Sequence, residues 1–181
     1  SRQHEALAYF KIKDSAILDG ARWFAAPRPR LLTLDNFVRD GNIVLSDREP
    51  MFDAANILRH NDDLLYLVSN SGNKKGGQYL QELLGHKYKV HLLEGVYSYM
   101  HIDSTVAFLR EGLMLLNPSR IPDKSIMPAP FNTWDAIYCP EPVDIGYTYY
   151  NNASPWVNVN LLSLSDKLVV VEEHQDNLRK E

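Results

Sequence analysis

Cysteine is nearly absent from the sequence: its 181 residues contain one, Cys139. A single cysteine cannot form an internal disulfide, so a hydrophobic core must hold the fold, as is usual in a reducing compartment. No apolar run approaches the ~20 residues that cross a bilayer, and the first residues lack the apolar stretch of a secretory signal. These absences predict a soluble, cytoplasmic protein with no membrane partner.

Blocks of like charge and metal-binding patterns are missing too. The formal net charge is −4, and no stretch of five like charges occurs, which argues against nucleic acid as a partner. Neither an H-x-H nor an H-E-x-x-H pattern is present, so no metal site is predicted. A small cationic substrate is compatible with this composition.

Hydrophobic residues make up 45% of the sequence, a share typical of a globular domain. Helical spacing of apolar residues predicts helices at 4–20, 53–60 and 78–84, and another from near Asp176. Buried or alternating strands are predicted at 42–45, 64–68 and 89–93. Prolines 27 and 29 break the segment 25–30 into a loop.

Two predicted hairpins of similar shape follow. One pairs 102–109 with 113–116, and the other pairs 157–164 with 168–171. A strand, strand, helix, strand unit that recurs about every 50 residues favours radial or stacked repetition over a doubly wound sheet. The chain lacks an initiating Met and begins and stops inside predicted helices, so we expect 1–181 to be one partial domain, truncated at both ends.

Two polar side chains suited to proton transfer and ion pairing stand two residues apart, at His101 and Asp103. The segment is predicted to be extended, and alternate residues of a strand project from one face. A histidine moves protons near neutral pH, and an ionised aspartate holds a cation. An isolated H-x-D pattern is a weak indication of a site.

Five segments in a fixed order make the pattern specific. They are the Gly-Ala-Arg-Trp and Ala-Pro-Arg-Pro of 20–29, the Glu-Pro-Met-Phe-Asp-Ala-Ala of 49–55, the Met-His-Ile-Asp of 100–103, the Asn-Pro-Ser-Arg of 117–120 and the Ser-Pro-Trp of 154–156. Over nearly the whole chain these resemble the arginine:glycine amidinotransferase family of the pentein superfamily, and most nearly its cyanobacterial members of saxitoxin or cylindrospermopsin pathways.

The resemblance implies an α/β fold: a pentein propeller of five ββαβ modules, of which this chain holds two to three. The implied reaction is ping-pong transfer of an amidino group from L-arginine to an acceptor amine through a covalent amidino-cysteine, with release of ornithine. It implies no cofactor and no metal, and it allows a homodimer. The residues leave the acceptor open among those the family uses: glycine, an inosamine phosphate or a long-chain amine of a toxin pathway.

Roles for individual residues also follow from the resemblance. His101 matches the general acid and base, and Asp53 matches the carboxylate that orients it. Asp103 matches a carboxylate that grips the substrate guanidinium, and Arg120 matches the group that binds the α-carboxylate. Two further substrate contacts are implied, at Ser154 and Met100.

Departures from the family pattern concern both chemistry and binding. Ala153 stands where a second serine is usual, and Asn56 replaces an aspartate. The glycine-rich segment with the nucleophilic cysteine is expected beyond Glu181, and a second guanidinium-binding carboxylate is expected before Ser1. Cys139 ends a predicted strand without that glycine context, which favours a small buried hydrophobe over a nucleophile.

Without the resemblance the same residues have simpler interpretations. Asp53 would cap the helix that follows it, or do so in addition to orienting His101. Arg120 would be a surface charge, Ser154 would belong to a turn, and Trp156 would pack. A guanidino-group hydrolase of the same fold, similar to arginine deiminase, and a non-catalytic pentein binding module stay open as alternative functions.

Overall fold

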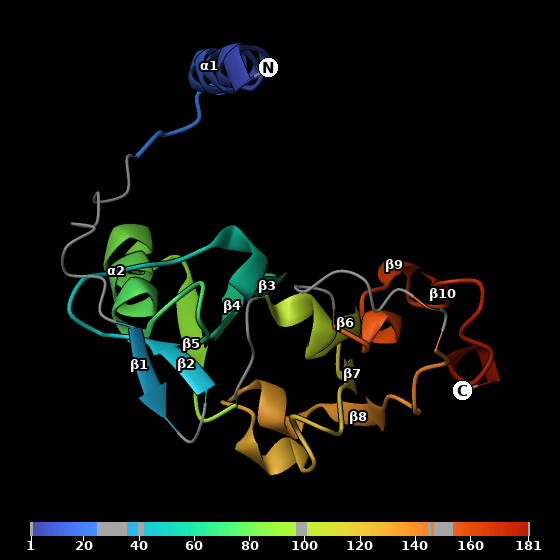
Figure 1. Cartoon of the computed structure of the whole chain (residues 1–181). Coiled ribbons are helices and arrows are strands. Elements are labelled where there is room, and N and C mark those ends of the chain that lie inside the picture. Colours follow the sequence, from blue (N-terminus) through green and yellow to red (C-terminus); the bar gives the residue numbers. More distant parts are fainter. Residues whose placement is uncertain are drawn as a thin grey trace.

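The computed structural model describes residues 2–24, 36–39, 42–96, 101–144, 146 and 154–180. Its strands form several small sheets instead of one continuous sheet (Figure 1). Two of these sheets have three strands each and share one topology, and two others are hairpins. The predicted mixture of helix and small repeated sheets is confirmed.

The first three-stranded sheet comprises β3 (Ile57–His60), β4 (Asp63–Leu67) and β5 (Lys89–Leu93). β3 pairs with β4 antiparallel, and β5 pairs with β4 parallel. A parallel pairing needs a crossover, which α2 (Lys74–Leu84) supplies. We call this strand, strand, helix, strand unit module 1.

Module 2 repeats the order with β6 (Val106–Arg110), β7 (Leu113–Leu116) and β8 (Asp135–Tyr138). Again the first pair is antiparallel and the second is parallel. Here the crossover contains two short 3₁₀ helices, η4 (Lys124–Ile126) and η5 (Phe131–Thr133), in place of an α-helix. The repeated topology confirms the recurring unit predicted from the sequence.

A hairpin lies on either side of these modules in the sequence. The first comprises β1 (Asn36–Arg39) and β2 (Asn42–Leu45), and the second β9 (Leu162–Ser165) and β10 (Leu168–Val170). The predicted first helix is present as α1 (Arg2–Leu18), which stands apart from the sheets (Figure 1). None of the described helices is long and apolar enough to cross a membrane.

The two modules share one hydrophobic core. Leu65 and Leu67 of β4 face Met114 and Leu116 of β7, and all four are almost fully buried. Phe131, which is fully buried, belongs to the same core. Because neighbouring residues of a strand project from opposite faces, Leu115 points the other way. It packs against a second cluster that contains Cys139 and Val159, so β7 is covered on both faces.

One predicted helix is wrong. In the segment 53–60 the structure has a 3₁₀ turn, η2 (Ala54–Asn56), followed directly by β3. The apolar residues Ile57 and Leu58 suit either a helix or a strand. Pairing with β4 decides for the strand, since tertiary hydrogen bonds outweigh the small differences in local propensity.

Three further secondary-structure predictions are wrong, because short 3₁₀ turns form in place of the predicted strands or helix. The residues before β6 form η3 (Ile102–Ser104), and those before β9 form η6 (Val157–Val159), where extended strands were predicted. The predicted helix near Asp176 is limited to the short turn η7 (Leu178–Lys180). In η3 the turn is closed by a hydrogen bond from the Thr105 N–H to the Ile102 carbonyl, at 2.8 Å, and both residues are buried.

Met51 ties the segment before Asp53 to module 1. Its N–H donates to Asn73 Oδ1 at 3.0 Å, and its carbonyl accepts from the Asn73 N–H at 2.9 Å. The Tyr66 hydroxyl donates to the same carbonyl at 3.1 Å, and burial raises the pKa of Tyr66, so the hydroxyl keeps its proton. The start of α2 thereby fixes the chain two residues before Asp53.

We expect Gly76→Ala to destabilise the protein. Alanine is better than glycine in a helix by about 1 kcal/mol, but the added Cβ would overlap the Met51 carbonyl oxygen. A backbone atom cannot yield as a side chain can, so the clash should dominate, with a net loss of about 1–3 kcal/mol. Urea unfolding measures the difference. Gln78→Ala, an exposed change in the same helix, is the control and should shift stability by less than about 0.5 kcal/mol. A Gly76→Ala protein as stable as wild type would contradict the assigned packing.

Candidate active site

Three 3₁₀ turns stand in corresponding positions, each just before a hairpin. η2 precedes β3, η3 precedes β6, and η6 precedes β9. η2 contacts η3, and η3 contacts η6, so the turns form a continuous row across three successive units. Three of the sequence-predicted site residues, Asp53, His101 and Asp103, lie on these turns or immediately before them.

Asp53 and His101 meet across the boundary between the modules. His101 Nε2 lies 3.3 Å from Asp53 Oδ2, and the two side chains are 32% and 45% exposed respectively. The other oxygen of Asp53 accepts a hydrogen bond from the Ala55 N–H at 3.0 Å, so Asp53 also caps η2. Asp53 therefore caps η2 and also contacts His101. A carboxylate that contacts an imidazole nitrogen can fix the orientation of the ring.

The turn that carries Asp53 rests on a buried polar network. Asn56 is fully buried. Its Nδ2 donates to Ser69 Oγ at 3.1 Å, and its Oδ1 accepts from Ser71 Oγ at 3.1 Å. An amide supplies both a donor and an acceptor without a charge, which suits a buried position. Asn56 thus ties η2 to Ser69 and Ser71 through an uncharged side chain.

Asp103 lies within η3, and the expectation that it shares a strand face with His101 is wrong. The segment is a 3₁₀ turn, with His101 as the residue before its first member. His101 points to Asp53 of module 1, whereas Asp103 Oδ2 accepts from Asn160 Nδ2 at 3.1 Å, just after η6. The two side chains therefore contact different neighbouring units.

Arg120 is held against the same turn. Its Nη1 donates to Ser104 Oγ and to Thr105 Oγ1, both at 2.7 Å. The Arg120 backbone is fixed as well, since its N–H donates to the carbonyl of the buried Asn117 at 3.1 Å. This half-buried, hydrogen-bonded guanidinium is not an ordinary surface charge. Three of the residues that contact Asp103 or Arg120 were not predicted from the sequence: Ser104, Thr105 and Asn160. Asn160 lies 57 residues from Asp103 in the sequence, and no motif surrounds it.

Ser154 is half-buried, and its Oγ accepts a hydrogen bond from the Trp156 N–H at 3.2 Å, which closes a turn before η6. Trp156 packs against the second core cluster, as predicted. Met100 lies outside the described residues, and so does Ala153. The structure thus brings Asp53 and His101 together and places Asp103 on the adjoining turn, to which Arg120 is hydrogen-bonded. Ser154 lies apart from these contacts, in the turn before η6.

Cys139 is a buried residue, as predicted. It is 2% exposed and packs in the cluster that contains Leu115 and Val159. Burial raises the pKa of the Cys139 thiol to about 11, although a hydrogen bond with the Asn158 side chain acts in the opposite direction. Within the described ranges no three His, Cys, Asp or Glu side chains gather as metal ligands would.

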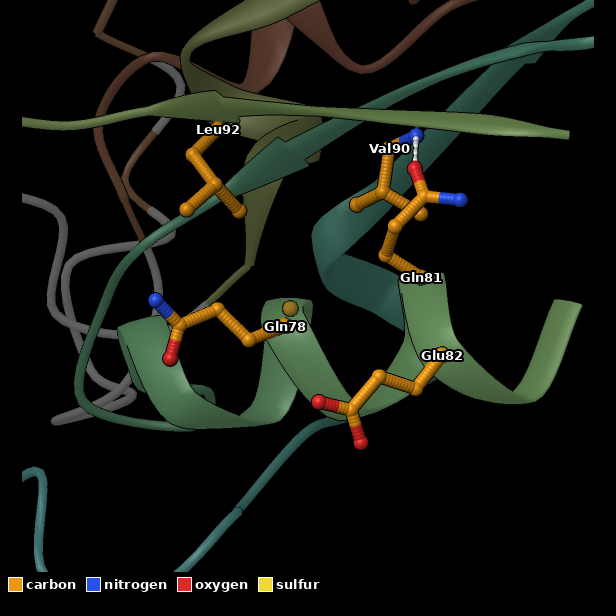
Figure 2. A pocket seen from close by; sticks show the side chains of 6 residues that line it. Gln78, Gln81, Glu82, Val90 and Leu92 are labelled. Atoms are coloured by element: carbon orange, nitrogen blue, oxygen red, sulfur yellow. Dashed lines mark hydrogen bonds between the residues drawn. The ribbon is translucent and has the colours of Figure 1, made fainter. Parts of the chain in front are cut away.

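A separate hollow of about 520 Å³ lies between α2 and β5 (Figure 2). Gln81 spans it, and its Oε1 accepts from the Val90 N–H at 2.8 Å. The lining contains one ionisable side chain and no residue of the three turns: Gly77, Gln78, Gln81, Glu82, Val90 and Leu92. Glu82 is the one ionisable group in this lining and no histidine lines the hollow beside it, so the hollow offers no carboxylate–imidazole pair like that of Asp53 and His101.

No sequence profile of a protein family matches the chain, but individual relatives do. It is 46% identical over 178 residues to inosamine-phosphate amidinotransferase 1 of Streptomyces glaucescens, which covers 97% of this chain and 51% of the relative. It is 36% identical over 189 residues to L-arginine:L-lysine amidinotransferase of Pseudomonas savastanoi pv. phaseolicola, covering 99% and 51%. SxtG, a saxitoxin-pathway amidinotransferase of Microseira wollei, superimposes with a TM-score of 0.82 at 30% identity, over 99% of this chain and 54% of that one.

The repeated modules, with polar side chains gathered on adjoining turns, define a pentein, the fold class predicted from the sequence. Within that class the chain is homologous to amidinotransferases, and the likeness extends along 97% or more of its length. It spans about half the length of the relatives it matches. The resemblance inferred from five short segments is confirmed.

We expect Cys139 to be chemically inert in the folded protein. With a thiol pKa of about 11, roughly one molecule in a thousand carries the reactive thiolate at pH 8. Iodoacetamide at pH 8 should leave Cys139 unmodified until urea unfolds the protein, as read by peptide mass spectrometry. Labelling in the folded state should increase as the pH approaches 11. Rapid labelling of folded protein at pH 8 would contradict the buried assignment.

Proposed function

We propose that the whole protein to which this chain belongs transfers an amidino group from L-arginine to an acceptor amine and releases ornithine. The observation that carries the proposal is the Asp53–His101 contact at the boundary between two modules, where both side chains remain open to a substrate. Support also comes from the relatives, one of which is named for arginine and lysine.

His101 is the proposed general acid and base, and Asp53 orients its ring. In the first half-reaction a cysteine thiolate attacks the guanidinium carbon of arginine. The bond from that carbon to arginine Nε then breaks, and the amine of the leaving ornithine takes a proton from His101. In the second half-reaction the acceptor amine gives a proton to His101 and attacks the amidino carbon, the carbon–sulfur bond breaks, and the thiolate is restored.

The substrate contacts proposed are ionic and directional. Asp103 would accept the guanidinium fork, which pairs best with a carboxylate. Arg120, already aligned by Ser104 and Thr105, would bind the α-carboxylate. Ser154 would contact the amino-acid end of the substrate, and Met100 would line the site. Cys139 is unsuited to be the nucleophile because it is buried and its pKa is raised, so the proposal places that cysteine beyond residues 1–181.

For the acceptor we propose a primary amine, and we put an inosamine phosphate first. The chain is 46% identical to an inosamine-phosphate enzyme, against 36% to one named for lysine and 29% to a glycine amidinotransferase of Danio rerio. An acceptor series on the purified whole protein, with mass detection of the amidinated product, would rank the three.

The proposed reaction predicts that ornithine forms from arginine only when an acceptor amine is added. Ornithine and amidinated amine should appear in equal amounts, because one amidino group moves per turnover. Chromatography with mass detection measures both. Citrulline and ammonia formed without any amine would instead identify a guanidino-group hydrolase, and binding of arginine with no turnover would identify a non-catalytic pentein.

Substitution of the paired residues should reduce turnover more than binding. We expect His101→Asn and Asp53→Asn each to lower kcat by about 10²–10⁴-fold, the usual contribution of a positioned proton-transfer group and its orienting carboxylate. KM for arginine should change much less, since neither side chain is assigned to grip it. His86→Asn, at an exposed histidine outside the site, is the matched control and should retain wild-type kcat. Full activity of His101→Asn would eliminate the assigned role.

A further inference from the structure

We propose that Asn160 is a positioning residue, whose side-chain amide orients the Asp103 carboxylate for the guanidinium of the donor. The inference rests on the proposed function for the identity of that cation. Asn160 Nδ2 donates to Asp103 Oδ2 at 3.1 Å. Within the described part of the chain, Asn160 is the one hydrogen-bond partner of the Asp103 side chain, and no described Lys or Arg forms an ion pair with it.

Both ends of this contact are held by buried neighbours. Val159 is fully buried and Asn158 is 2% exposed, and Asn158 Nδ2 donates to the Pro140 carbonyl at 3.0 Å. On the other side, Ile102 is 2% exposed and precedes Asp103 directly. The buried neighbours thus fix the backbone at Asn160. This fixed backbone places the exposed Asn160 side chain beside Asp103.

The chemistry of an amide suits this task. A guanidinium is planar, and two parallel hydrogen bonds form only when the carboxylate plane is aligned with it. A donor on one oxygen fixes that plane in advance, which lowers the cost of ordering the site when substrate binds. An amide is neutral, so the negative charge of Asp103 remains available, whereas a lysine or arginine at position 160 would neutralise the charge that is to hold the substrate.

The geometry therefore predicts a selective effect of Asn160→Ala. We expect the dissociation constant for arginine to rise about tenfold, the factor for loss of one hydrogen bond to a charged group. The dissociation constant for norvaline, which has the same amino-acid end as arginine but no guanidinium, should stay unchanged. Calorimetric titration of the whole protein measures both. In an Asp103→Asn background, Asn160→Ala should have no further effect, because it acts through the carboxylate.

The matched control is Asn177→Ala. Asn177 is also exposed, and its Nδ2 donates to a backbone carbonyl, that of Glu141, at 3.2 Å; its loss should leave arginine binding unchanged. Equal weakening of arginine and norvaline by Asn160→Ala, or the same weakening in the Asp103→Asn background, would overturn the inference in favour of a general structural role. Failure of the wild type to bind arginine would also overturn it. Arginine binding without ornithine formation would instead reject only the proposed transfer, so the two failures are distinguishable.

Discussion

Burial of leucine and aromatic side chains between the two three-stranded sheets is the interaction on which the rest of this structure depends. β4 and β7 each contribute alternate leucine or methionine side chains to a common core, and Phe131 from the second crossover belongs to it. Each module has fewer than about 40 residues, a length at which a chain rarely buries enough apolar surface to fold alone. Packing module 1 on module 2 therefore both stabilises the sheets and fixes the relative position of their first turns.

That fixed position is what creates the site. Asp53 and His101 belong to different modules, and their 3.3 Å separation exists only because η2 and η3 are held side by side. The same principle recurs one unit further on, where Asp103 of η3 meets Asn160 just after η6. Because the unit is repeated, a 3₁₀ turn recurs before each of three hairpins. Contacts between adjoining turns then bring together polar side chains from distant parts of the sequence.

Secondary structure was predicted most accurately where a segment shows one clear local pattern of apolar residues. The apolar run at 64–68 and the alternation at 89–93 correspond closely to β4 and β5, and Cys139 is buried as expected. The prediction failed at 53–60 and at 102–105, where short segments fit helix, strand or turn almost equally well. At 57–60 the hydrogen bonds to β4 decide the outcome, and no local pattern contains them. At 102–104 a local hydrogen bond closes a turn in place of the predicted strand. The error mattered for the site, because the shared strand face proposed for His101 and Asp103 does not exist.

The sequence by itself determined the fold class, the family and the list of candidate residues, since five ordered segments carry that information in residue identity alone. The tertiary structure decided which of those residues meet. It joined Asp53 to His101, placed Arg120 on Ser104 and Thr105, and brought Asn160, 57 residues away, to Asp103. Residue identity determines which chemistry is available, but contacts between modules arise from packing of apolar faces far apart in the chain, and only the folded arrangement specifies them.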